Sequence, residues 1–175
     1  MELPIDTIAT PDVRLFYALY WPQRSILRDF FSLLPEQHYD VRLVDTPTRH
    51  ADTPRESLIH LIRIQQIYLA ALLTRVLRFE PQQPAILSTT SKPELLRIWE
   101  QLEQAMFQTL TADTFNPTLL ITVPWGESAP VDLLFFLRDH DILHIGWNLA
   151  VMDHLDLPRF ASLNAYWGSG DADAL

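Results

Sequence analysis

Apolar residues recur at helical spacing in four separate stretches of the chain, with prolines and polar capping residues between them. The first stretch predicts an amphipathic helix over residues 12–34, with Pro22 as a kink or a restart. Its apolar positions are Val13, Tyr17, Tyr20, Leu27 and Phe31. The last stretch predicts a helix over residues 131–155, which ends before Pro158.

Two start signals mark the helices between these stretches. Thr53, Pro54 and Glu56 place an N-cap, a first-turn proline and a capping-box glutamate in order, so we expect a helix over residues 54–78. The segment from Ser91 to Glu94 repeats the signal and predicts a helix over residues 92–110. Four helices of this length, with no strongly alternating strands, indicate an all-α four-helix bundle.

The connections between the helices are unusually long. Residues 35–52 and 111–130 exceed most loops of a compact domain, so they predict crossover connections rather than tight antiparallel turns. Residues 39–44 can be extended, and residues 118–126 are apolar enough to form a short strand or a lid over one end of the bundle. We expect one domain over residues 1–167 and a flexible tail at residues 168–175.

Composition narrows the functional classes. A net charge of −9 without any basic run argues against binding to nucleic acid or to an anionic membrane. The chain has no cysteine, which excludes disulfides, cysteine-ligated metals and a cysteine nucleophile. Its most apolar stretch, residues 58–77, is interrupted by arginines and glutamines, and its N-terminus carries acid instead of the base of a signal peptide. These features predict a cytoplasmic protein.

Three histidines are the candidate chemistry. His140 and His144 are four residues apart, so they share one face of the fourth predicted helix, and His60 lies on the apolar stripe of the second. Both sets are expected to point into the core, where three imidazoles would hold one divalent metal with coordination positions left open. Two alternatives to metal binding stay open. A lone histidine is usually a core residue with its hydrogen bond made, and the spacing of the pair is common in helices by chance. The zinc-protease pattern is absent, because Asp141 follows His140 where that pattern has glutamate.

The remaining candidate polar residues are not expected to bind a metal or a substrate. Arg24 shares the apolar stripe of the first helix, and we expect a snorkelling side chain there in preference to a clamp for a substrate anion. His38 and His50 lie in the loop before the second helix, and His154 lies at the end of the fourth, where it favours the helix dipole. Gln65 is among the residues able to line a cavity, without any feature that selects it.

Two motifs carry a resemblance to a known family. The segment from Thr53 to His60 and the segment His140-Asp141-Ile142-Leu143-His144-Ile145-Gly146 resemble the DinB/YfiT-like metalloenzymes. The resemblance covers nearly the whole chain and extends to Leu157-Pro158-Arg159-Phe160 and to Tyr166-Trp167. The chain departs from it at Ile145-Gly146-Trp147, where relatives often have Arg-Gly-Gln.

The resemblance implies a four-helix bundle that holds nickel or zinc through His60, His140 and His144. It further implies a thiol S-transferase, in which the metal favours the thiolate of a small-molecule thiol. The same site with bound water would give a hydrolase, and a third alternative is a non-catalytic metal-binding module for dimerisation or stress response. The second helix is apolar almost all round, which together with the resemblance predicts a homodimer.

Overall fold

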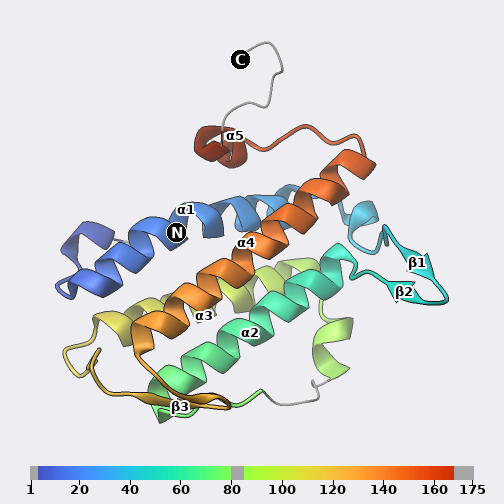
Figure 1. Ribbon diagram of the computed structural model, residues 1–175. Coiled ribbons are helices and arrows are strands. Elements are labelled where there is room, and N and C mark those ends of the chain that lie inside the picture. The colour runs from blue at the N-terminus through green and yellow to red at the C-terminus, as the bar shows by residue number, and fades with distance from the viewer. Residues whose placement is uncertain (1–3, 80–84, 168–175) are drawn as a thin grey trace.

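The computed structural model describes residues 4–79 and 85–167, and it confirms the all-α class (Figure 1). Its α-helices are α1 (Pro11–Leu33), α2 (Pro54–Thr74), α3 (Lys92–Thr111), α4 (Pro130–His154) and α5 (Ala161–Trp167). Short 3-10 helices are η1 (Ile5–Thr7), η2 (Glu36–His38) and η3 (Ala85–Thr89). The predicted flexible tail, residues 168–175, lies outside the described residues.

The four long helices lie side by side (Figure 1). α1 packs against α4 and α3, and α2 packs against α3 and α4, so each helix has two long neighbours. α5, which the sequence pattern did not predict, packs on α1. The predicted spans of α1, α3 and α4 agree with the structure to within one residue at each end.

The start of α2 is fixed by the predicted capping box. The backbone N–H of Glu56 donates to Thr53 Oγ1 at 3.2 Å, and the backbone N–H of Thr53 donates to Glu56 Oε2 at 2.8 Å. The second predicted box does not form. Ser91 makes no side-chain cap, and Glu94 binds Arg97 in the next turn instead.

The end of α2 comes earlier than residue 78, where the periodicity placed it. Arg75 adopts a left-handed conformation with φ 61°, which closes the helix after Thr74. Beyond it, Val76 forms a β-bridge with Thr122, and the backbone N–H of Leu77 donates to the Thr122 carbonyl at 2.8 Å. Pairing with a distant segment therefore ends the helix, although its apolar pattern continues.

Each long connection contains a short antiparallel hairpin. β1 (Asp45–Thr46) pairs with β2 (Arg49–His50) beside the start of α2, and β3 (Ile121–Val123) pairs with β4 (Gly126–Ser128) beside the start of α4 (Figure 1). The predicted strand in residues 118–126 is thereby confirmed. The extended segment expected at residues 39–44 is not a strand, and the hairpin follows it.

The core consists of two hydrophobic clusters separated along the helices. One cluster takes α1 residues from Val13 to Tyr20, and the other takes α1 residues from Ile26 onwards. α2, α3 and α4 likewise each contribute one segment to each cluster. The position between the two segments is occupied on every helix by a buried polar residue. These four residues, which we call the polar layer, are Arg24, Gln65, Glu103 and Asp141.

The apolar character of α2 is explained by packing within the chain. α2 contacts α3, α4 and η3, and ten of its residues are buried. By length and composition alone α2 could cross a membrane, but half of its most apolar window is buried inside the protein, as in the core helix of a globular fold. The predicted homodimer and cytoplasmic location stay predictions.

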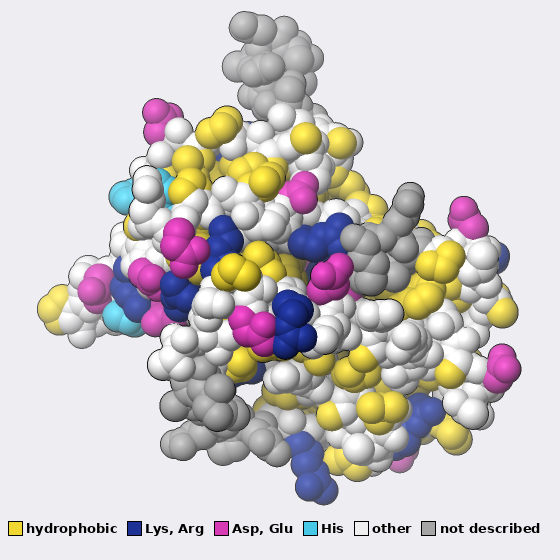
Figure 2. Space-filling view, turned by 180° about the vertical axis from the view of Figure 1, so that it is seen from behind, with side chains coloured by type: hydrophobic (Ala, Val, Ile, Leu, Met, Phe, Trp, Pro, Cys, Tyr) yellow, Lys and Arg dark blue, Asp and Glu magenta, His cyan; other side chains and the backbone are white. Residues whose placement is uncertain are grey.

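The surface carries both signs of charge. On the face in Figure 2, basic and acidic side chains of the described residues lie interspersed. The predicted absence of nucleic-acid and membrane partners, which followed from the net charge of −9, stays a prediction.

Candidate metal centre

The three predicted histidines meet where α2 packs against α4. One ring nitrogen from each of His60, His140 and His144 lies within 4.8 Å of the others. The ring centroids are 4.6 Å apart for the two histidines of α4, and 5.0 and 5.2 Å from these rings to that of His60. Residues separated by about 80 positions in the sequence thus form one cluster of potential ligands.

The closest approach within the cluster joins two ring nitrogens. His60 Nε2 and His140 Nε2 are 2.9 Å apart, so one of them donates a hydrogen bond to the other. Two imidazoles bound to one tetrahedral zinc ion, with zinc–nitrogen bonds of 2.0–2.1 Å, hold their nitrogens about 3.3 Å apart. A few tenths of an ångström of movement would therefore convert this contact into a pair of metal ligands.

The face assignment had predicted that the histidines point into the core. In the structure they lie at its edge instead. On α4 the buried stripe runs through Leu137, Asp141, Ile145 and Asn148, and both histidines lie beside it. All three imidazoles are half-buried. The four residues of this stripe take the core positions of α4, and the two histidines beside it meet His60 of α2. Their partial exposure gives a ligand access to the cluster.

A hydrogen bond holds one ring on α4, and a buried carboxylate lies close to the other. The fully buried Ser57 places its Oγ 2.8 Å from His144 Nδ1, which leaves His144 Nε2 as the nitrogen available for a metal. His140 Nδ1 is buried without a hydrogen-bond partner among the described residues, and it lies 3.8 Å from Asp141 Oδ1. Ser57 and Asp141 were not selected from the sequence.

The surroundings of His60 and His144 favour their neutral form. Burial, together with the neighbouring His140 and His60, lowers the pKa of the His144 imidazole to about 4. Burial and His140 also lower the pKa of His60, although the nearby Asp52 opposes this effect. His60 and His144 are therefore neutral at neutral pH, which is the state in which imidazole binds a metal.

A cavity of about 360 Å³ opens beside His144. Its lining comprises Ser57, Leu143, His144 and Trp147 from the helices, with His50, Ala51 and Asp52 from the end of the β1–β2 hairpin and the segment after it. His50 Nδ1 lies 2.9 Å from Asp45 Oδ1, its partner in the strand register. His50, predicted to be an ordinary loop residue, thus lies at the cavity, whereas His38 and His154 lie outside the cluster.

Arg24 occupies the centre of the polar layer, and the predicted snorkelling position is wrong. Only 1% of its surface is exposed. Its guanidinium donates to Glu103 Oε1 at 2.5 Å, to Asp141 Oδ2 at 2.8 Å and to Gln65 Oε1. It also lies 4.0 Å from the centre of the Trp99 ring. Each long helix supplies one residue to the hydrogen bonds of this network, and α3 adds the Trp99 ring.

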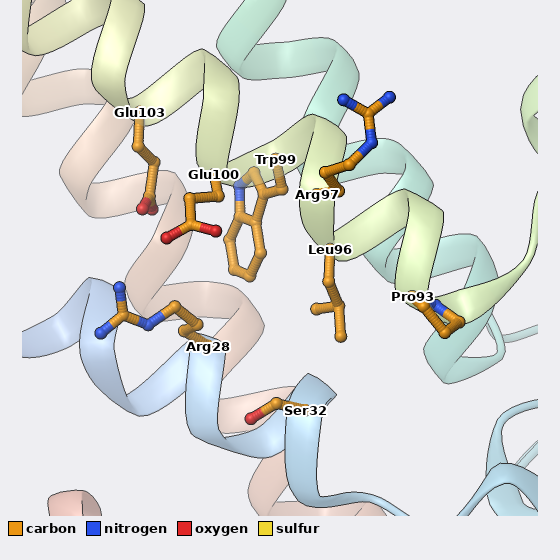
Figure 3. A pocket seen from close by; sticks show the side chains of 8 residues that line it. All are labelled: Arg28, Ser32, Pro93, Leu96, Arg97, Trp99, Glu100 and Glu103. Carbon is orange, nitrogen blue, oxygen red and sulfur yellow. The ribbon is translucent and has the colours of Figure 1, made fainter. Parts of the chain in front are cut away.

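Glu103 joins the polar layer to a groove between α1 and α3 (Figure 3). The groove has a volume of about 390 Å³, and Arg28, Trp99 and Glu100 also line it. Burial raises the pKa of Glu103, and Arg24 partly offsets that rise. The groove lies between a different pair of helices from the histidine cluster, so it forms a separate feature.

Comparisons with known proteins add no identification. No protein-family model matches the sequence, and no curated protein matches it. The resemblance to the DinB/YfiT-like family therefore stays a prediction, and the functional argument depends on the geometry of the cluster.

Proposed function

We propose that this protein is a metal-dependent enzyme in which His60, His140 and His144 hold one divalent ion. The observation that carries the proposal is the convergence of three ring nitrogens within 4.8 Å at the edge of an open cavity. Around this site we propose a four-helix bundle of the DinB/YfiT-like kind, with crossover connections. The packing of the four long helices and the two hairpin-containing connections support it.

The chemistry of the ligands fits a borderline divalent metal. Neutral imidazoles suit zinc and nickel, and burial keeps His60 and His144 in the neutral form. The unpartnered His140 Nδ1 indicates that this ring is not fully satisfied by contacts within the chain. Three protein ligands leave a coordination position open, as in catalytic zinc sites. We therefore propose nickel or zinc as the resident ion.

Such an ion supplies a Lewis acid that favours the deprotonated form of a thiol or a water molecule. The chain has no cysteine, so a reacting thiol would come from a small-molecule cosubstrate. The cavity has the size of a small-ligand site, and Leu143 and Trp147 give it apolar surface. Asp45 holds His50 through Nδ1, which leaves His50 Nε2 free to accept the proton that the thiol loses.

The proposed reaction is S-transfer. The thiol sulfur forms a bond to an electrophilic carbon in the cavity, the leaving group departs with the bonding electron pair, and His50 holds the thiol proton. The His50 side chain at the cavity is exposed to solvent, so water can reach the site as well as a thiol. Hydrolysis through metal-activated water is accordingly the second candidate.

The test begins with purified protein loaded with zinc or nickel. This protein is incubated with low-molecular-weight thiols and an electrophile, and in parallel with activated esters. S-conjugation that depends on the ion and disappears in His144→Ala, but persists in the matched control His38→Ala, supports the proposal. Ester cleavage without conjugation favours the hydrolase. A loaded protein that is inert in both assays contradicts an enzymatic role.

A further inference from the structure

A buried contact between His140 and the polar layer is incomplete. His140 Nδ1 and Asp141 Oδ1 are both buried without hydrogen-bond partners among the described residues, and they lie 3.8 Å apart. Buried nitrogen and oxygen atoms are almost always hydrogen-bonded, because an unpaired polar group costs about 1–3 kcal/mol. A ring N–H and a carboxylate oxygen are complementary. A small rotation of the imidazole would let the first donate to the second.

The carboxylate is held rigidly for this role. Asp141 is fully buried, and its other oxygen accepts a hydrogen bond from Arg24 Nη1 at 2.8 Å. Arg24 is fixed in turn by Glu103, by Gln65 and by the Trp99 ring. The position of Oδ1 is therefore set by three helices other than the one that carries His140.

The charge of the layer favours a positive neighbour. Asp141 and Glu103 are two carboxylates around the single guanidinium of Arg24, so the buried network contains one more acid than base. A buried charge without compensation is costly. His140 lies between Asp141 and the proposed ion, so a metal-bound imidazole would bring positive charge to the side where the free carboxylate oxygen lies.

We propose that Asp141, held by Arg24, is the positioning residue of the metal centre. It accepts a hydrogen bond from His140 Nδ1–H and thereby leaves His140 Nε2 as the ligating nitrogen. The inference rests on the proposed metal site and deepens it. Ser57 performs the corresponding task for His144 with a neutral hydroxyl, so His140 is the ligand that receives anionic support.

Two matched substitutions test the proposal. Asp141→Asn and Glu103→Gln each remove one carboxylate from Arg24, but only Asp141 lies beside His140. Zinc affinity is measured by competition with a chromophoric chelator at a temperature where circular dichroism shows both variants folded. We expect Asp141→Asn to weaken zinc binding about 10- to 100-fold and Glu103→Gln to change it less than about threefold. Equal losses in the two variants would show a purely structural role and overturn the inference.

The wild-type protein provides a test that needs no variant. Long-range ¹⁵N–¹H NMR correlations of the zinc-loaded protein assign the tautomer of each histidine. We expect His140 to carry its proton on Nδ1 and to bind zinc through Nε2. Zinc bound through His140 Nδ1 overturns the inference while leaving the metal site intact. Wild-type protein that binds no zinc overturns the proposed function itself, so the two failures are distinguishable.

Discussion

Replacing Arg24 with methionine should destabilise the fold strongly, because it removes the only base from a buried layer that contains two acids. Arg24→Met retains an unbranched side chain of comparable length, so packing between the two hydrophobic clusters is largely preserved. The change deletes hydrogen bonds to Glu103, Asp141 and Gln65. It leaves both carboxylates buried, at 3% and 0% exposure, without a cation in the layer.

The expected loss follows from the cost of breaking a buried ion pair. Removing one partner of such a pair costs about 3–5 kcal/mol, since the remaining charge stays buried. The three hydrogen bonds of the charged guanidinium, at about 1.5–3 kcal/mol each, set an upper bound on the loss of stability. The substitution also removes the desolvation cost of the buried guanidinium, which makes the net loss smaller. We therefore expect about 3–5 kcal/mol less free energy of unfolding, a large share of the roughly 5–15 kcal/mol of a typical domain.

The pH dependence of this loss has a definite sign. Burial already raises the pKa of Glu103, and Arg24 is the main influence that lowers it. Without Arg24 the pKa of Glu103 in the folded state rises further above its unfolded value. A group with a raised folded pKa stabilises the fold at low pH, and that contribution is lost as pH rises through the folded pKa. The deficit of Arg24→Met should therefore be larger at pH 8 than at pH 5.

Urea denaturation of both proteins at pH 5 and pH 8, monitored by circular dichroism, measures the two effects. The triple variant Arg24→Met, Glu103→Gln, Asp141→Asn serves as the control, since it removes the uncompensated charges and should recover part of the loss. A deficit below about 1 kcal/mol at pH 8, against the 3–5 expected for a broken buried pair, would refute the reasoning. A deficit larger at pH 5 would refute it equally.

Three further predictions concern the helix start, the histidine cluster and the cavity. Thr53→Ala should cost about 1 kcal/mol in urea denaturation, whereas Ser91→Ala, which has no cap bond to lose, should cost less than about 0.5; equal losses would contradict this. The metal-free protein should lose about 2–3 kcal/mol between pH 6.5 and 4, because His144 and His60 have lowered folded pKa values and the unfolded chain takes up their protons first. Constant stability over that range in urea titrations would refute the neutral state of these two histidines. His50→Gln should lower conjugation turnover at least about tenfold without changing bound metal, as for loss of a general base, and unchanged turnover would exclude that role.

The helices could be predicted from the sequence because their signals are local. The capping box at Thr53 and the 3.6-residue apolar period depend only on neighbouring residues, and the structure reproduces them. The end of α2 could not be predicted in this way. It is set by pairing between Val76 and Thr122, and the apolar pattern of the helix continues beyond it. The seven-residue α5 was missed because so short a segment gives too little periodicity.

The histidine cluster was accessible to sequence analysis, but its surroundings were not. Spacing places His140 and His144 on one helical face, whereas the choice of the face that enters the core depends on contacts between helices. Arg24 appeared to be a surface residue because its partners, Glu103 and Asp141, come from distant helices. A signal was nevertheless present, since each long helix has a polar residue midway along its largely apolar buried stripe.

The central claim is tested most directly by the metal content of the purified chain. Protein stripped with a chelator, incubated with zinc or nickel and desalted is analysed by mass spectrometry of the metal. The account predicts about one ion per chain for the wild type and for His154→Ala, and no more than about a tenth of that for His144→Ala. A wild type without metal, or a His144→Ala variant that retains full occupancy, would contradict it.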